Sequence, residues 1–289
     1  NKFYSIAGIQ YQKEIMEAAN APENYQNDIY LNLVYLDPSG LNLNTGLRYN
    51  IHEAYGGHLI YSLNPSFSFD LDANYLMKLM SSYSKAFIAP SLYQLYDPSY
   101  GNKSLEPENN LSFELGFELR STQSVLNIVY FNRKEKPTLI FNITPTDSKP
   151  YGGYDNSDRQ IIYRGLEFAY DFELFEKVKT GLNYVFTETT NGDLRSIPKH
   201  SISGLIDIPI TVKTYLNLIG QFTGNRIAND YTELDPYSLF TLQINYQLEK
   251  LNTNLFFSIF NLFDTQYVII PQYQTRGRNI MMGLTVNLF

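Results

Sequence analysis

The sequence predicts an all-β fold, a transmembrane antiparallel β-barrel, and three observations lead to it. First, many segments alternate between apolar and polar residues: over 111–120 every odd position is Leu or Phe, while the even positions are Ser, Glu, Gly, Glu and Arg. Second, short and long connections between these segments take turns along the chain. Third, no run approaches the roughly 18 apolar residues of a spanning helix, so a membrane protein of this sequence has to be a barrel.

Alternation is the signature of strands with one apolar and one polar face, because successive side chains of a strand point to opposite sides. The pattern predicts about fourteen strands of roughly ten residues, the length that a tilted strand needs to cross a bilayer. In chain order they are residues 3–12, 28–36, 41–51, 58–69, 75–84, 111–120, 125–131, 165–172, 181–187, 201–208, 215–223, 240–248, 251–262 and 280–289.

The connections divide into two kinds. The DPSG sequence at 37–40 is a tight turn, in which Pro pre-sets φ and Gly tolerates positive φ. Other short links are expected at 70–73, 120–123, 175–178, 209–213 and 249–250, and longer loops at 20–27, 86–110, 145–157, 225–236 and 264–276. Bacterial barrels have short periplasmic turns and long outer loops, so this rule places both chain ends on the periplasmic side.

Composition narrows the function classes. The net charge of −7 leaves no basic stripe for phosphates, so no nucleic-acid partner is expected. The absence of cysteine excludes a disulfide framework and a thiolate metal site, and leaves the compartment open. The 25 tyrosines and 19 phenylalanines suit rings at a membrane interface. A passive porin and, outside membranes, a secreted β-sandwich binding protein stay open as alternatives.

Two stretches resemble the TonB-dependent outer-membrane receptors. SYSKAFIAPSL at 82–92 followed by GNKSLEPENNLSFELGFE at 101–118 is similar to that family's barrel signature. NLFDTQY at 261–267, then Gly277, Arg278 and the terminal Phe289, is similar to its C-terminal signature. Phe289 has the opposite parity to the preceding apolar positions, so the face of the strand to which its side chain points stays open.

The resemblance implies an outer-membrane import receptor with no enzymatic activity. Such receptors have a barrel of about 22 strands, an N-terminal plug and a TonB-binding segment, so residues 1–289 are expected to be the C-terminal portion of the barrel, without the plug. The implied partners are the missing strands and plug, the TonB complex through that plug, outer-membrane lipid and a candidate surface lipoprotein. The expected ligand class is cobalamin or an iron-siderophore, with a glycan importer as the alternative within the family. A self-closed barrel of about fourteen strands is the other architecture.

We expect side chains of the outer loops to contact the ligand, because aromatic surfaces and a few polar groups there can bind a large molecule. The alternative for each tyrosine is a headgroup anchor or loop packing. The candidates are Tyr93, Tyr96, Tyr100, Tyr151, Tyr154, Arg226, Tyr231, Tyr267, Tyr273 and Arg276.

Charged residues of the polar parity are expected to line the water-filled interior or contact a plug, and lining is the default over catalysis. They are Arg48, Glu114, Glu118, Arg120, Glu167 and Asp171.

The sequence gives little support for a catalytic site or a metal site. His52 and His58 bracket a hairpin tip without metal-ligand spacing, and His200 and Ser201 are neighbours that point to opposite faces, so no hydrolase site is expected. No metal site is therefore predicted. Ca²⁺ in an outer loop is the one cofactor considered, since carboxylates cluster there, with a solvated acidic loop as the alternative. Its candidate ligands lie in Glu106, Pro107 and Glu108 and at Asp155 and Asp158.

Overall fold

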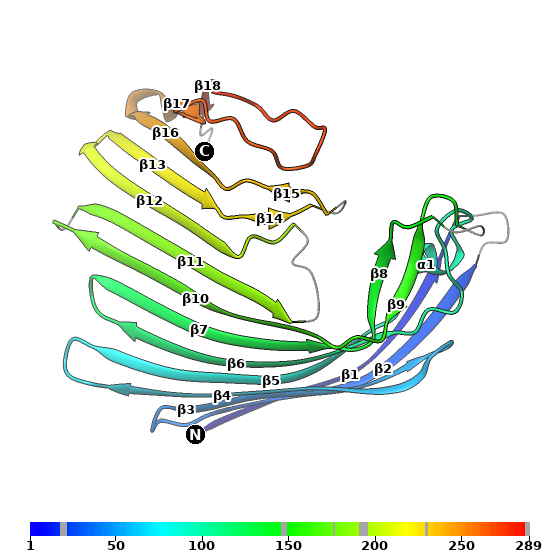
Figure 1. The fold of residues 1–289 in the computed structure, drawn as a ribbon. Coiled ribbons are helices and arrows are strands. Elements are labelled where there is room, and N and C mark those ends of the chain that lie inside the picture. Colours follow the sequence, from blue (N-terminus) through cyan, green and yellow to red (C-terminus); the bar gives the residue numbers. More distant parts are fainter. Residues whose placement is uncertain (18–21, 146–148, 176, 191–195, 229–230, 287–289) are drawn as a thin grey trace.

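The structure is a computed structural model that describes residues 1–17, 22–145, 149–175, 177–190, 196–228 and 231–286 (Figure 1). Phe289 lies outside the described residues. The long strands of the sheet are β1 (Lys2–Ile15), β2 (Glu23–Leu36), β3 (Leu41–His52), β4 (Gly56–Asp70), β5 (Leu76–Ile88), β6 (Glu108–Arg120), β7 (Ser124–Glu135), β10 (Ile161–Leu174), β11 (Val178–Thr190), β12 (His200–Thr211), β13 (Thr214–Thr223), β16 (Tyr237–Leu248), β17 (Thr253–Phe260) and β18 (Asn279–Val286).

These strands form one 14-stranded antiparallel sheet in which neighbours in sequence are neighbours in space. The sheet curves like the wall of a wide cylinder (Figure 1). It is open: β1 and β18 form its two edges, and within the described residues they do not pair with each other. The all-β antiparallel prediction is confirmed, whereas closure of the barrel by this chain alone is not seen.

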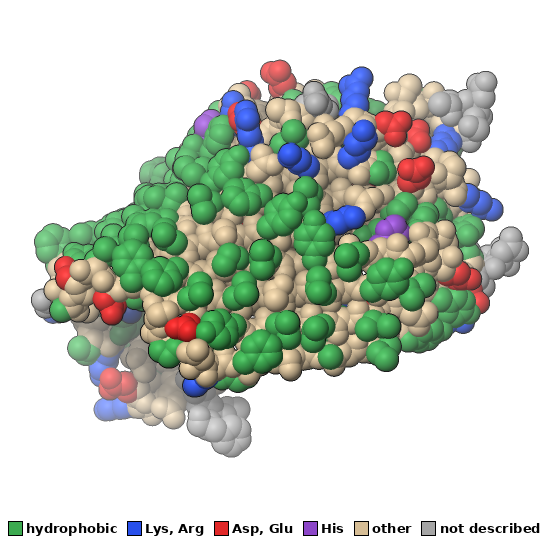
Figure 2. All heavy atoms as spheres, turned by 90° about the horizontal axis from the view of Figure 1, so that it is seen from below, with side chains coloured by type: hydrophobic (Ala, Val, Ile, Leu, Met, Phe, Trp, Pro, Cys, Tyr) green, Lys and Arg blue, Asp and Glu red, His purple; other side chains and the backbone are tan. Residues whose placement is uncertain are grey.

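One face of the sheet is apolar from strand to strand. Registered partners continue a single row across seven strands: Leu79, Phe117, Ile128, Phe168, Tyr184, Ile202 and Phe222. Leu115 of the same face exposes 54% of its surface, and no second sheet or helix of the described chain covers it. Seen from below, hydrophobic side chains are spread across the outer side of the sheet among other residues, and most of the charged side chains lie towards the edges of the view (Figure 2). An uncovered apolar face of this extent is expected to contact lipid.

The wall has little apolar core of its own. Its most deeply buried side chains are polar, with Asp28 at 0% and Asn50 at 1% exposure. The buried hydrophobic residues instead gather at one end of the sheet, and include Leu92, Leu95 and Leu105 of the connection between β5 and β6. The packed hydrophobic interior of this chain is therefore in its outer loops.

The connections follow the predicted order. Short links join β2 to β3, β4 to β5, β6 to β7, β10 to β11, β12 to β13 and β16 to β17 at one end, and the long loops emerge at the other (Figure 1). Lys2 pairs with Leu36 and Val286 with Thr253, so β1 begins and β18 ends beside the short links.

Three predicted loops contain additional structure. The 86–110 loop carries helix α1 (Leu92–Tyr96), the 145–157 excursion belongs to a hairpin of β8 (Thr138–Asn142) and β9 (Gly153–Ser157), and the 225–236 loop holds β14 (Arg226–Ile227) and β15 (Glu233–Leu234). These elements are too short to show a period in the sequence. No helix in the described part of the chain is long and apolar enough to span a bilayer.

Most strands are longer than predicted, up to 15 residues for β4, whereas β17 covers only Thr253–Phe260 of the predicted 251–262. The link between β12 and β13, predicted at 209–213, is shorter than predicted. β12 runs through Pro209 to Thr211, with a register shift between these two residues. Proline cannot donate to the strand ladder, so an irregularity of this kind accommodates it.

Candidate functional site

The loop between β5 and β6 is folded rather than extended. Ser91 caps α1: its Oγ accepts a hydrogen bond from the Gln94 backbone N–H at 3.2 Å, and the Gln94 side chain accepts one from the Ser91 N–H at 2.8 Å. This reciprocal pair satisfies amide groups that a helix start would otherwise leave free. Leu92 and Leu95 of α1 are buried. Gly101 is needed behind the helix, because a Cβ there would approach the Asp97 carbonyl oxygen to 2.5 Å.

The β8–β9 hairpin packs against this loop through an aromatic cluster. The Tyr154 ring lies edge-on to Tyr93, with centroids 6.1 Å apart, and to Phe141 at 5.2 Å, and Phe141 meets Tyr100 at 5.7 Å. Figure 1 places α1 beside β8 and β9. Three predicted ligand candidates, Tyr93, Tyr100 and Tyr154, are thus brought together. Phe141 was missed, although it lies in the apolar TLIF run at 138–141.

The remaining two aromatic candidates of this region lie outside the cluster. The Lys103 ammonium is 5.2 Å from the centre of the Tyr96 ring, and Tyr151 is exposed at the end of the hairpin. Burial raises the pKa of the Tyr93 phenol above its ordinary value, with Asp97 acting in the same direction, so this hydroxyl is neutral at physiological pH. The Tyr93 hydroxyl therefore adds no charge to the aromatic cluster.

A second group forms where the last long loop, residues 261–278, meets β14 and β16. The Arg226 guanidinium lies 4.9 Å from the centre of the Tyr237 ring and donates a hydrogen bond to the Val268 carbonyl. Tyr237 in turn packs on Tyr267 at 4.8 Å. Arg226 is only 7% exposed. Arg226 and Tyr267 were predicted as ligand contacts, but their partners are within the protein, and Tyr237 was missed.

The C-terminal signature folds into a closed loop. The Asn261 side chain donates to the Thr265 carbonyl at 2.9 Å and accepts from the Thr265 N–H at 2.9 Å, while Asp264 accepts from the Arg278 N–H at 2.6 Å. Asn261 and Asp264 both have positive φ, which short polar side chains tolerate. A Cβ at Gly277 would lie 2.7 Å from Asp264 Oδ1. These signature residues shape the loop.

Next to this loop is a pocket of about 760 Å³ on the polar face of β13, β16, β17 and β18. Tyr267 and Arg276 line it together with Asn261. The structure thus brings two more predicted residues to one cavity, whereas Tyr231 and Tyr273 are exposed on their loops.

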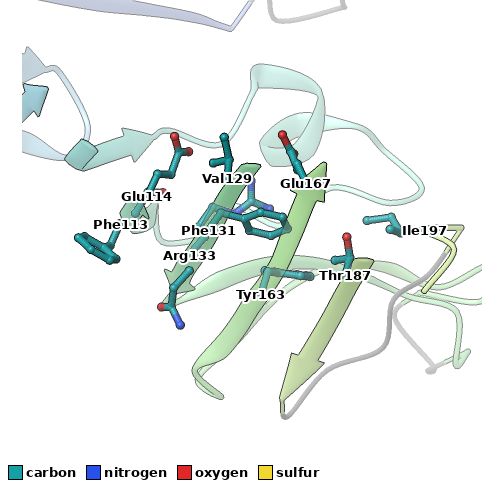
Figure 3. A pocket seen from close by; sticks show the side chains of 11 residues that line it. Phe113, Glu114, Val129, Phe131, Arg133, Tyr163, Glu167, Thr187 and Ile197 are labelled. Carbon is teal, nitrogen blue, oxygen red and sulfur yellow. The ribbon is translucent and has the colours of Figure 1, made fainter. Parts of the chain in front are cut away.

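The charged residues of the polar parity lie on the concave face. Glu114 and Glu167 line a pocket of about 340 Å³ over β6, β7 and β10, and their carboxylates point to the same side of the strands (Figure 3). Glu118 pairs with Arg120 at 3.1 Å on this face. Asp171 lines a separate pocket near the short links.

Arg48 lies near a buried carboxylate in another part of the same face. Its Nη1 is 3.9 Å from Asp28 Oδ2, and its Nη2 donates to the Gln10 side chain at 3.2 Å. Asn50 donates to the other oxygen of Asp28 at 2.6 Å. The buried carboxylate is therefore held by hydrogen bonds, as burial of a charge requires.

The histidines contact aromatic rings. His58 stacks on Phe87 with centroids 3.8 Å apart, and His52 lies edge-on to the same ring at 6.2 Å. His200 forms a 2.9 Å hydrogen bond with the Tyr184 hydroxyl.

The carboxylates considered for Ca²⁺ are divided between the two packed loops. Glu108 accepts from the Leu139 N–H at 2.5 Å, and Asp155 lies 3.5 Å from the Asn102 side-chain amide. Within the described residues, no group of three or more His, Cys, Asp or Glu side chains is placed to hold a metal ion.

Fold and site together define one class of protein: the wall of a transmembrane β-barrel with an apolar outside, a polar inside and structured loops at one end. The sequence model described as "TonB dependent receptor-like, beta-barrel" matches residues 8–262. The chain therefore belongs to the TonB-dependent receptor family and forms part of its β-barrel.

Curated relatives include two kinds of receptor. The chain is 25% identical over 251 residues to the vitamin B12 transporter BtuB of Vibrio cholerae serotype O1, covering 84% of this chain and 39% of that protein. It is 25% identical over 272 residues to the ferric enterobactin receptor of Pseudomonas aeruginosa, covering 78% and 35%. The chain thus spans less than two fifths of the length of these relatives.

Solved structures share the fold. The siderophore receptor PirA from Pseudomonas aeruginosa superposes with a TM-score of 0.78 at 19% identity, over 98% of this chain and 53% of that one. The copper transporter OprC gives a TM-score of 0.80 at 13% identity, over 98% and 54%. The relatives and solved structures named here are described as transporters or receptors.

Proposed function

We propose that this chain belongs to an outer-membrane active-transport receptor that binds a scarce, large ligand at its outer loops and imports it with energy supplied through TonB. The ligand class is cobalamin or an iron-siderophore. The observation that carries the proposal is the family match over residues 8–262, with relatives named for exactly these two ligand classes. The chain carries out no covalent chemistry in this scheme.

The outer loops supply the contact surface. The cluster of Tyr93, Tyr100, Phe141 and Tyr154 offers flat aromatic faces with phenol hydroxyls. Such a surface suits a large ligand with apolar rings and dispersed polar groups. The exposed Tyr151 and Tyr273 and the pocket-lining Arg276 are the further candidate contacts.

The concave face lines the proposed route of the ligand through the barrel. Its carboxylates at Glu114 and Glu167 are open to the interior and lack an ion pair among the described residues. We place the plug against this face, with the remaining strands closing the wall and TonB acting on the plug from the inner membrane. Calcium bound at the acidic loop residues and a surface lipoprotein are secondary proposals within this scheme.

A binding titration on the intact, plug-bearing receptor tests the ligand class. Purified in detergent, the receptor is expected to bind either cyanocobalamin or a ferric catecholate siderophore saturably, while a glycan oligosaccharide of similar mass does not bind. Binding of the glycan alone would contradict the ligand class and favour a glycan importer.

A second measurement separates active import from a passive porin. Uptake of the bound ligand into cells should stop when TonB is removed. Uptake that continues unchanged without TonB would contradict the transport mechanism, whatever ligand is bound.

A further inference from the structure

The 89–107 loop and the β8–β9 hairpin are joined by an unusual pair of hydrogen bonds. The Asn156 side chain accepts from the Glu106 backbone N–H at 2.7 Å through Oδ1 and donates to the Glu106 carbonyl at 3.0 Å through Nδ2. One amide side chain thus satisfies both backbone groups of a residue fifty positions away. Both hydrogen-bonding directions are used, which fixes the orientation of the side chain as well as its position.

Further contacts tie both strands of the hairpin to the same loop. On β9, the Tyr154 N–H donates to the Tyr100 carbonyl at 3.0 Å, and Asn102 donates to the Tyr154 carbonyl at 3.2 Å. On β8, the Leu139 N–H donates to the carboxylate of Glu108, the first residue of β6 directly after this loop. The contacts therefore run along the hairpin rather than meeting at one point.

The joined loops share an apolar centre with a third loop. Leu105, which precedes the bridged residue, is only 2% exposed, and the Tyr55 hydroxyl in the β3–β4 turn donates to its carbonyl at 3.0 Å. Burial of Leu92, Leu95 and Leu105 adds the hydrophobic contribution that the wall lacks. Loops with buried apolar contacts and satisfied backbone groups open less readily than solvated loops.

We propose that the 89–107 loop and the β8–β9 hairpin form one preassembled body, and that Asn156 is the positioning residue that locks them together. This step rests on the proposed import function. The preassembled body holds its aromatic cluster in the binding arrangement before a ligand arrives. The conformational entropy of the two loops is then lost when the protein folds rather than when the ligand binds. Loss of the Asn156 side chain should loosen residues 101–106 next to Glu106 without unfolding the hairpin, because the contacts of Tyr154 with Tyr100 and Asn102 remain.

Hydrogen exchange on the intact receptor in detergent tests the lock without any ligand. Asn156→Ala should speed exchange of the amides in 101–106 roughly tenfold, as expected when a pair of local hydrogen bonds is lost. Asn142→Ala is the matched control on the same hairpin, since the Asn142 side chain accepts from Thr144 within its own loop. The control should leave 101–106 unchanged.

Asn156→Asp separates the two bonds, because its carboxylate can accept from the Glu106 N–H but cannot donate to the carbonyl. The Glu106 amide should therefore stay more protected in this variant than in Asn156→Ala. Unchanged exchange in Asn156→Ala, or equal loss of protection at 101–106 in Asn142→Ala, would overturn the proposal.

Ligand kinetics test the consequence for binding, with cyanocobalamin and ferric enterobactin as the probes. For the probe that binds, Asn156→Ala should raise koff roughly fivefold, with little change in kon. If neither probe binds, the ligand class fails while the exchange result still decides the lock. An unaltered koff alongside tenfold faster exchange would show that the two loops are joined but do not preorganise the site, which would overturn that part of the proposal.

Discussion

At the scale of single residues, Arg226 illustrates how a buried cation can be structural in a protein that handles ligands. Its guanidinium plane faces Tyr237 and reaches the Val268 carbonyl, so it joins β14, β16 and the last long loop. Stacking and a fixed fork of donors are properties of arginine that lysine does not share.

Replacement of Arg226 should release the 261–278 loop. We expect Arg226→Ala and Arg226→Lys both to lower the local stability of residues 265–270 by about 2 kcal/mol, because a charged hydrogen bond and the ring contact are lost. Hydrogen exchange of 265–270 measures the change. Arg278→Ala is the control, since its described bond uses the backbone N–H. Full protection in Arg226→Lys would mean that charge alone holds the loop.

At the scale of elements, the short links are stabilised by local hydrogen bonds. In the link between β2 and β3, Asp37 accepts from the Ser39 N–H at 2.8 Å and from the Tyr35 hydroxyl at 2.6 Å. Hydrogen bonds from Ser39, then from Tyr35, lower the pKa of the Asp37 carboxyl from 3.8 to about 2. Because the folded pKa lies below the unfolded one, the stabilising contribution is present above pH 3.8 and is lost as pH falls through 2.

A carboxyl-carbon NMR titration of Asp37 in the folded receptor checks this shift. The midpoint should lie near pH 2, and it should move towards 3.8 in Ser39→Ala, which removes the side-chain donor of Ser39 but keeps its N–H, and in Tyr35→Phe, which removes the phenol donor. A wild-type midpoint at the ordinary value would contradict the role of these hydrogen bonds.

The strand β6 permits a paired test of the two faces. Leu115→Lys places a charge in the apolar face near the middle of the strand and should cost about 2–4 kcal/mol if that position lies at the bilayer midplane. Ser112→Lys places the same charge on the polar face and should cost little. Unfolding by urea in lipid, followed by heat-modifiable gel mobility, gives both values. Equal costs would argue against lipid contact by the apolar face.

The sequence could predict the strands because each carries a period of two over many residues, as in 111–120. It could not predict α1, β8–β9 or β14–β15, which depend on contacts between distant segments: Phe141 of β8, for example, packs on Tyr100 of the preceding long loop. The site was predicted as a set of loop tyrosines, but which of them converge depends on how the hairpin folds onto its neighbour.

At the scale of the whole molecule, the concave face carries two carboxylates, Glu114 and Glu167, that have no ion-pair partner among the described residues and lie where the plug is proposed to be. Glu114 and Glu167 share one pocket, while Glu118 is already paired with Arg120. The two free carboxylates are therefore better placed than Glu118 to meet cationic groups of another segment.

The double variant Glu114→Gln and Glu167→Gln should weaken retention of the plug. We expect the variant receptor to show larger ion conductance in planar bilayers under urea than wild type, because charge-assisted contacts to the plug are lost. Glu118→Gln is the control on the same face and should behave as wild type. Identical conductance in all three proteins would contradict a plug contact at these residues.

Within the described residues, the buried hydrophobic side chains lie in and beside the long loops, and this has a consequence for how solvents act on this chain. The rim around Leu92, Leu95 and Leu105 is held together by exclusion of water, whereas the wall depends on the amphiphile that surrounds it. Cosolutes that change water should therefore act first on the rim, and changes in acyl-chain length should act first on the wall. The loop rim and the sheet wall thus respond to different environmental variables, so in the proposed function ligand capture can be adjusted separately from anchorage in the membrane.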